Sequence, residues 1–205
     1  MFNLYYHPIY TYGIDEKSNF PRDRYQLIKQ ELQMHLNKNF IEIKNSPIVD
    51  ESIINKIHDA NYVNRFLNQK LDSKEIRRIG LKPWKREIIE RTLRITGGSI
   101  AAMQDAIMTG GVSGNMAGGT HHAHKYYGSG FCIFNDIAIC AKIALEKPNI
   151  KNILIIDLDV HQGDGTAEIL KNDKRAFTFS MHCSSNFPFQ KAKSDLDISI
   201  QKNIE

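Results

Sequence analysis

One short segment of the sequence places three possible metal-binding side chains at intervals of two residues. It reads ILIIDLDVHQGDG and contains Asp157, Asp159 and His161. Because side chains on an extended strand alternate between faces, this spacing would direct all three to the same side. Two carboxylates and an imidazole that converge need a positive charge among them, and this donor set suits zinc. The segment therefore predicts a divalent metal site.

A second segment, GGTHHAH, places two histidines next to each other in glycine-rich sequence. On a regular strand His121 and His122 would face opposite ways, whereas a loop can direct both imidazoles into one cavity. Imidazoles titrate near neutral pH and could divide base and acid work beside a metal-bound water. Such histidines need orienting carboxylates, and Asp157 and Asp164 remain for this once the metal ligands are assigned.

Each of these residues has a simpler explanation when it is taken alone. Asp164 could cap a helix that begins near Thr166. A single histidine such as His161 could be structural, and we interpret His124 and His182 in that way. The simple explanation of the whole set fails because DxDxH, GDG and the glycine-framed histidine pair occur together.

The elements that must position these residues alternate between strands and helices. Strands are expected over 2–6, 153–157 and 176–180, and helices over 21–36, 84–108 and 135–146, with one or two short helices within 50–67. This alternation is typical of an α/β fold with parallel strand pairing. The all-apolar start of 153–157 indicates a strand buried on both faces, whose acidic end lies at the ligand-binding edge of the sheet. Gly97 and Gly98 should weaken their helix unless another backbone packs closely there.

Composition excludes several other classes of protein. The 205 residues are about one domain, and 41% hydrophobic with 24% charged residues exclude a disordered chain and a coiled coil. No apolar run approaches the roughly 20 residues of a membrane span, and the start lacks a signal peptide, so we expect a cytoplasmic protein without membrane contact. A net charge of +4 without a Lys/Arg run predicts no specific nucleic-acid binding. The three cysteines form no CxxC pair, so neither a disulfide framework nor a thiolate zinc site is expected.

Five segments of the sequence resemble, in the same order, histone deacetylase-like amidohydrolases of the arginase/deacetylase superfamily. They read YYHPIYTY, GGTHH, GSGFCIFND, IDLDVHQGDG and FSMH. Gln162 stands where the larger deacetylase classes usually carry a second histidine, so the sequence is most similar to class IV and its bacterial relatives. The resemblance implies a three-layer αβα fold with a mainly parallel sheet.

The resemblance also implies roles for the residues of the two segments above. Asp159 and His161 would be zinc ligands. His122 would be the proton shuttle and His121 an electrostatic partner. The carboxylate partner of His121 would be Asp157, and that of His122 would be Asp164.

Further positions follow from the same resemblance. Gly130 and Phe131 would supply the backbone contact and one aromatic wall of a substrate tunnel, and Phe187 the opposite wall. Two apolar walls suit the aliphatic stem of an acylated lysine. A potassium ion is expected near Asp157 and Ser180.

The family's third metal ligand, an Asp, and a Tyr that polarises the substrate carbonyl have no counterpart in this sequence. We therefore expect residues 1–205 to be a single deacetylase-like domain that is incomplete at its C-terminus, roughly the N-terminal two-thirds. The expected activity is zinc-dependent removal of acetyl or other acyl groups from lysine-like amines, with acylated lysine or acylated polyamine as substrate.

Two alternatives of other classes remain. The first is a catalytically inactive fragment, because two metal ligands are fewer than the three that are usual for catalytic zinc. The second is a phosphatase of the haloacid dehalogenase type, which also has a strand that ends in DxD. That class carries Thr or Val where His161 stands, and it leaves the histidine pair without a use. The sequence gives even less support to a dinucleotide-binding fold, because no GxGxxG is present.

Overall fold

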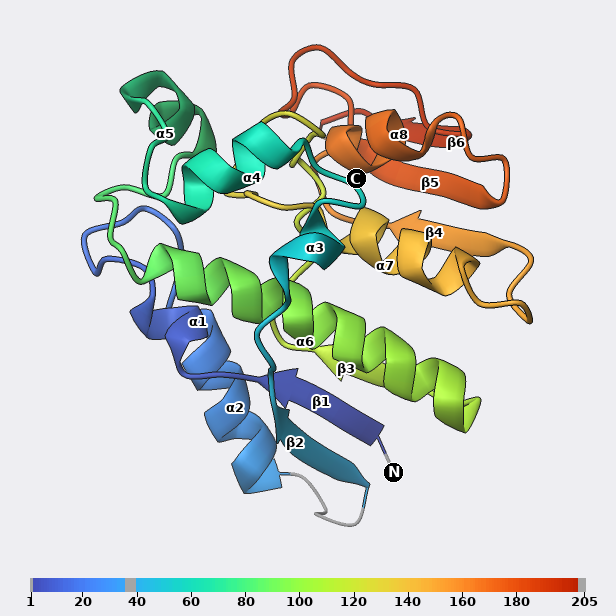
Figure 1. The fold of residues 1–205 in the computed structure, drawn as a ribbon, viewed down its shortest axis with the longest axis horizontal. Helices are drawn as coiled ribbons and strands as arrows, with labels where there is room; N and C mark the ends of the chain where they lie inside the picture. The colour runs from blue at the N-terminus through green and yellow to red at the C-terminus, as the bar shows by residue number, and fades with distance from the viewer. Residues whose placement is uncertain (1, 36–39, 203–205) are drawn as a thin grey trace.

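The strands of the computed structural model form two parallel sheets (Figure 1). The structure describes residues 2–35 and 40–202. The strands are β1 (Phe2–Tyr6), β2 (Ile41–Asn45), β3 (Ser113–Asn115), β4 (Ile153–Asp157), β5 (Ala176–Cys183) and β6 (Leu196–Ile200). One sheet has the order β2-β1-β3 and the other the order β4-β5-β6, and all four strand pairs in these ranges are parallel. The arrows of β1 and β4 point the same way in Figure 1.

Helices separate most of the strands along the chain, and a loop over residues 184–195 joins β5 to β6. The helices are α1 (Ile9–Tyr12), α2 (Arg24–His35), α3 (Glu51–Ile54), α4 (Ala60–Leu67), α5 (Ser73–Ile79), α6 (Ile88–Thr109), α7 (Asp136–Leu145) and α8 (Asp164–Leu170). The expected α/β class is therefore confirmed. Residue 36, the last of the helix expected over 21–36, lies outside the described residues. None of the helices in the described ranges combines the length and apolar character that a membrane crossing requires.

Local sequence explains where several helices begin. Asp50, Asp59 and Asp72 each accept a hydrogen bond from a backbone N–H in the first turn of α3, α4 and α5. Asn135 does the same for α7. Each cap satisfies an N–H group that has no partner within the helix.

Within the glycine pair of α6, Gly97 packs against another segment of backbone, as the sequence analysis required, and Gly98 packs against side chains. A Cβ atom at Gly97 would lie 2.1 Å from the carbonyl oxygen of Pro47, and one at Gly98 would lie 2.7 Å from the side-chain oxygens of Ser46 and Tyr10. Any larger residue would push the segment that follows β2 away from α6. This close approach fixes α6 against the first sheet, where it also contacts β1 and β3.

The expectation that β4 is buried on both faces is wrong. Ile155 is 9% exposed, but Leu154 and Ile156, which alternate with it, are 60% and 59% exposed. α7 contacts β4 and α8 contacts β5. No helix within 2–35 or 40–202 covers the face that carries Leu154 and Ile156.

Candidate active site

The tandem histidines lie on a loop between β3 and α7, and each one contacts its own carboxylate. His121 Nδ1 lies 2.6 Å from Asp157 Oδ2, and His122 Nδ1 lies 2.6 Å from Asp164 Oδ1. The two ring centroids are 4.0 Å apart. Asp157 is the last residue of β4 and Asp164 the first of α8, so the end of a strand and the start of a helix position the pair. The contacts that the sequence predicted are therefore present.

Burial and the two carboxylates shift the pKa values of the histidines in opposite directions. Burial lowers the pKa of His121, but the hydrogen bond and negative charge of Asp157 outweigh it and raise the pKa above its ordinary value. At His122 burial dominates and lowers the pKa despite Asp164. Burial raises the pKa of the Asp164 carboxyl, but hydrogen bonds from His122 and His124 outweigh this and hold it well below its usual range. The two imidazoles are thus electrostatically different although they are neighbours.

A third histidine holds the other oxygen of Asp164. His124 Nε2 lies 3.2 Å from Asp164 Oδ2. The His124 ring stacks on Tyr127 with 4.6 Å between centroids, and the guanidinium of Arg78 lies 4.1 Å above the Tyr127 ring. The sequence analysis interpreted His124 as structural, and the structure shows how: His124 fixes the carboxylate that contacts His122. The HHAH sequence could have indicated this contact, because a histidine two residues after His122 can reach the same carboxylate, Asp164.

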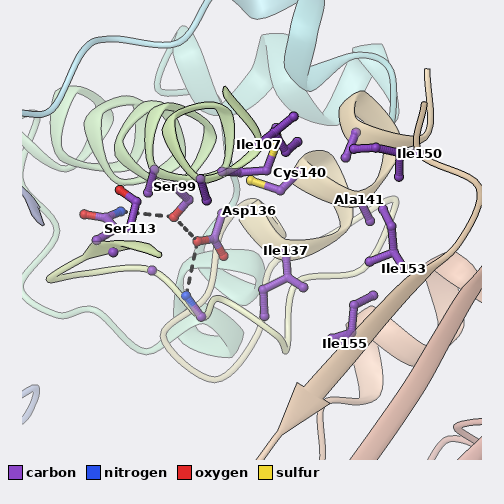
Figure 2. A pocket seen from close by; sticks show the side chains of 18 of the residues that line it. Ser99, Ile107, Ser113, Asp136, Ile137, Cys140, Ala141, Ile150, Ile153 and Ile155 are labelled. Atoms are coloured by element: carbon purple, nitrogen blue, oxygen red, sulfur yellow. Dashed lines mark hydrogen bonds between the residues drawn. The ribbon is translucent and has the colours of Figure 1, made fainter. Parts of the chain in front are cut away.

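Asp136, which the sequence analysis did not single out, anchors the start of the histidine loop. Its carboxylate accepts hydrogen bonds from Thr120 N at 2.8 Å, Thr120 Oγ1 at 2.6 Å and Gly119 N at 3.2 Å. It also accepts one from the hydroxyl of Ser99 on α6 (Figure 2). Because Asp136 lies in the first turn of α7, its negative charge also suits the helix dipole.

His58 and Asn135 fasten the far end of the same loop. The Asn135 N–H donates to His58 Nε2 at 2.9 Å, so the proton of this imidazole is on Nδ1, which donates to the carbonyl of His124 at 3.0 Å. The Asn135 side chain donates to the carbonyl of Ala123. Burial lowers the pKa of His58 to about 4, against smaller opposing effects of backbone hydrogen bonds. His58 is therefore a neutral part of the scaffold at neutral pH.

The two predicted metal ligands lie beside the histidine pair but not on a strand. β4 ends at Asp157, whose Oδ1 accepts from Asp159 N at 3.0 Å, and Asp159 Oδ1 accepts from His161 N at 2.8 Å. The expectation of one extended strand through all three residues is therefore wrong, because these side-chain-to-backbone hydrogen bonds turn the chain. His161 still reaches the site, with its ring centroid 5.8 Å from that of His122.

The donor atoms of this pair fit two of the ligands of a zinc ion. Asp159 Oδ1 and His161 Nδ1 are 3.1 Å apart, and two atoms at this separation can both lie within about 2.0–2.2 Å of one ion. The two side chains are 50% and 40% exposed. In the part of the chain that the structure describes, no cluster of three or more His, Cys, Asp or Glu side chains is placed to hold a metal.

The predicted substrate-contacting residues divide into two groups. The Phe187 ring lies 4.8 Å from that of His122 and 6.3 Å from that of His161. Gly130 has φ +51°, and a Cβ there would lie 2.6 Å from His122 Cδ2, so only glycine fits between the imidazole and its neighbours. Phe131 is 40% exposed and packs on Phe20, with 5.3 Å between ring centroids. Gly130 and Phe187 thus border the histidines, and Phe131 contacts Phe20 instead of either histidine ring.

Two further residues position the second sheet. Ser180 is the strand partner of Asp157, and its hydroxyl lies 3.0 Å from His182 Nδ1. Potassium near Asp157 and Ser180 stays a prediction. Gln162 is buried, donates to Asp197 Oδ1 and the carbonyl of Ala192, and accepts from Ala192 N. Gln162 therefore joins the loop that carries Asp159 and His161 to the segment at the start of β6.

Comparisons with known proteins agree with this geometry. The sequence matches the histone deacetylase domain family over residues 18–204. It is 42% identical over 207 residues to an uncharacterized protein of Picosynechococcus, covering 100% of this chain and 67% of that protein. It is 31% identical over 174 residues to the acetoin utilization protein AcuC of Staphylococcus aureus, covering 79% of this chain and 44% of that protein.

A solved structure shares the fold. The crystal structure of an HDAC homolog from Aquifex aeolicus matches with a TM-score of 0.78 at 22% identity, covering 99% of this chain and 60% of that one. The fold is thus that of an α/β protein of the arginase/deacetylase kind. The chain belongs to the histone deacetylase domain family, and it spans about two-thirds of the length of the first relative and less than half of AcuC.

Proposed function

We propose that the domain represented by this chain removes acetyl or other acyl groups from lysine-like amines by zinc-dependent hydrolysis. The observation that supports this most directly is the arrangement of two histidine–carboxylate pairs beside Asp159 and His161. Each imidazole is held at Nδ1 by its own acid, so each Nε2 atom is free for chemistry. Membership of the histone deacetylase domain family supports the same reaction class.

In this proposal Asp159 and His161 hold the zinc ion as two of its protein ligands. Zinc, when bound, polarises the acyl carbonyl and lowers the pKa of a bound water. The histidine pair then transfers the proton and stabilises the negative charge that develops.

His122 accepts the water proton at Nε2 and later returns it to the leaving amine, because Asp164 holds its Nδ1 proton in place. The ring centroid of His121 lies 4.0 Å from that of His122, and His121, backed by Asp157, stabilises the negative charge that develops. His124 keeps Asp164 in position through the second carboxylate oxygen.

The proposed substrates are acylated lysine side chains and acylated polyamines. Gly130 and Phe187 border the histidine pair, and with Phe131 they would line the path of the aliphatic stem. Asp157 and Ser180 are partners in the β4–β5 register. Potassium bound near them would stabilise the C-terminal end of β4, which carries Asp157.

The experiment that tests this function measures zinc-dependent release of acetate from acetyl-lysine peptides and acetylated polyamines by the protein. His122→Ala should lower kcat by about 10²–10⁴-fold because the proton-transfer group is lost. Asp159→Asn should abolish zinc-dependent turnover. Asp23→Asn, a surface carboxylate whose side chain is 67% exposed, serves as the matched control and should leave activity unchanged. Full activity after His122→Ala and Asp159→Asn together would refute the assignment.

A second candidate is that residues 1–205 alone are inactive, and one observation favours it. The described residues supply only Asp159 and His161 near one another as metal ligands, and catalytic zinc usually has three protein ligands. Titration of zinc into this chain, followed by calorimetry, separates the two. Tight stoichiometric binding with turnover would contradict the inactive alternative, whereas weak binding without turnover would support it.

A further inference from the structure

A large groove lies beside α8 and extends to the loop that carries the histidines. It has a volume of about 1190 Å³. α7 and α8, which contact each other, contribute to its walls (Figure 1). The remaining lining comes from three segments of the chain outside these helices, 56–57, 124–127 and 188–192, and from the residues that follow α8.

Two walls of the groove are connected to the histidine pair. His124 and Asp164 both line the groove, and Asp164 holds His124 with one carboxylate oxygen and His122 with the other. On the wall formed by 188–192, the Phe189 ring lies 6.5 Å from that of Phe187, which in turn lies 4.8 Å from that of His122. An occupant of the groove would therefore contact side chains that are one residue removed from His122.

The lining of the groove is positively charged. Three carboxylates, those of Asp164, Glu168 and Asp173, face twice as many cationic side chains. The net charge of the whole chain is only +4, so the groove concentrates much of its excess positive charge. The six cationic side chains belong to Lys56, Lys125, Lys142, Lys171, Arg175 and Lys191.

Three of these cations form no ion pair with any residue that the structure describes. Lys125 Nζ lies 5.4 Å from the centre of the Tyr126 ring, and Lys191 Nζ donates to the carbonyls of Asn186 and Pro188. Lys142 of α7 is the third. The other three cations each contact a carboxylate of this chain. Three ammonium groups of the groove are thus available to carboxylates from another molecule.

Aromatic side chains stand among the charges. Tyr126 is 59% exposed and Phe189 is 92% exposed, and both line the groove. Ile57 and Leu170, which are buried, add apolar surface between them. Exposed aromatic side chains are enriched at protein interfaces, where they act as anchors. The groove therefore offers apolar contacts as well as positive charge.

We propose that this groove binds an acidic peptide segment of a partner protein, in which carboxylates alternate with apolar or aromatic residues. Its carboxylates would contact Lys125, Lys142 and Lys191, and its apolar side chains would pack on Tyr126 and Phe189. Opposite charges on the two surfaces would speed association and disfavour basic partners.

The distribution of charge favours a peptide over other anionic occupants. The six cations lie on five separate segments, whereas a single phosphate would need several donors around one point. A nucleic acid carries a phosphate at every nucleotide and would place negative charge beside Asp164, Glu168 and Asp173. The backbone N–H groups of a peptide can instead donate to these carboxylates. A second copy of this chain, with its net charge of +4, would add excess positive charge.

The test is a binding measurement with a defined probe. Fluorescence anisotropy would follow a fluorescein-labelled peptide that repeats Glu-Glu-Leu-Phe three times as the protein is added. This peptide should bind about tenfold or more tighter than one that repeats Lys-Lys-Leu-Phe, which has the same apolar residues. Salt at about 1 M should weaken the binding, because charges are then screened beyond about 3 Å.

Charge variants with a matched control place the peptide in the groove. Lys125→Gln together with Lys142→Gln should weaken binding by about fivefold or more, since each exposed ion pair contributes about two- to fivefold. Lys70→Gln together with Lys74→Gln removes the same charge from exposed positions outside the groove and should leave binding unchanged. Circular dichroism checks that both variants fold.

An aromatic pair provides an independent variant. Phe189→Ala should weaken binding by about fivefold or more, as the loss of an interface anchor does. Phe40→Ala, at a side chain that is 67% exposed and outside the groove, is the control and should have no effect. In nuclear magnetic resonance spectra, the imidazole signals of His124 should shift when the peptide is added, whereas those of His7, outside the groove, should not.

Three results would overturn the proposal. The first is equal binding of the acidic and basic peptides. The second is an equal effect of the groove and control substitutions. The third is tighter binding of an oligouridylate of similar length than of the acidic peptide, which would make a nucleic acid the occupant. None of these readouts depends on zinc or catalysis, so the proposed function can fail while this inference stands.

Discussion

The candidate site has two halves that differ in how completely the described residues build them. The side chains of His121, His122 and their carboxylates are 4–12% exposed and are joined by 2.6 Å contacts. Asp159 and His161 are 50% and 40% exposed and contact mainly each other. The half with the two histidine–carboxylate pairs is thus formed by the packing of the described residues. The half with Asp159 and His161 is open to solvent in the described structure.

The largest expected effect is the loss of a carboxylate from the buried half. Asp164→Ala leaves His122 and His124 without their shared acceptor and should lower the free energy of unfolding by about 3–5 kcal/mol. Asp159→Ala, in the exposed half, should change it by no more than about 0.5 kcal/mol. Urea denaturation of both variants measures the difference. Equal losses of unfolding free energy in Asp164→Ala and Asp159→Ala would contradict the difference between the two halves.

Acid should weaken the scaffold of the buried half. His58 has a pKa of about 4 in the folded protein, below its ordinary value of 6.5, so the unfolded state binds more protons between these values. Stability from this group is complete above pH 6.5 and is lost as pH falls towards 4, by about 2–4 kcal/mol in total. Urea midpoints at several pH values measure this loss, and His58→Gln should remove that part of the slope. An unchanged slope in the variant would contradict the role of His58.

A methyl group added at Gly163, between the two halves of the site, should destabilise the half that contains the histidine–carboxylate pairs. A Cβ at Gly163 would lie 2.2 Å from Asp157 Oδ2, so Gly163→Ala should move that carboxylate from His121 and cost about 1–3 kcal/mol. Gly111→Ala is the control, because its Cβ would meet only the Thr109 hydroxyl at 3.3 Å. Thermal unfolding compares the two, and similar transition temperatures would show that the contact relaxes without cost.

The smallest expected effect concerns the second imidazole on Asp164. His124→Gln removes a 3.2 Å contact while His122 remains bound to the other oxygen, and should cost about 0.5–1.5 kcal/mol. Lys125→Gln, at an exposed neighbour, should have no effect. Chemical denaturation with both variants decides this. A loss as large as that of Asp164→Ala would mean that His124, and not the carboxylate, holds the buried half together.

Much of the fold could be predicted where local pattern and burial agree. The strand expected over 2–6 is β1, the apolar run of 153–157 predicted β4, and the helical pattern after Asn135 predicted α7. β3 could not be predicted in this way. It has only three residues, Ser-Gly-Asn, and it is a strand because Asn3 to Tyr5 pair with it from a distant part of the chain.

The site shows the same division between local and tertiary causes. Motif chemistry singled out Asp157 and Asp164 as orienting acids for the two histidines, and the family resemblance implied the pairing of His121 with Asp157 and of His122 with Asp164. The role of Asp136 could not be predicted, because its partners Ser99 and Thr120 come together only when α6, α7 and the loop have packed. The exposure of Leu154 and Ile156 was missed because an apolar run gives no information on whether a neighbour covers it.

The position of β1 in its sheet has a consequence for synthesis on the ribosome. β1 is made first but lies between β2 and β3, and Ser113, which follows Asn3 by 110 residues, pairs with it last. At roughly 5–20 residues per second, translation delivers that partner about 5–20 s after the first strand. During this interval one edge of β1 has no strand partner, and an unpaired strand edge favours pairing with other chains. Synonymous codons that slow translation between β2 and β3 would lengthen this exposure and lower the yield of folded protein.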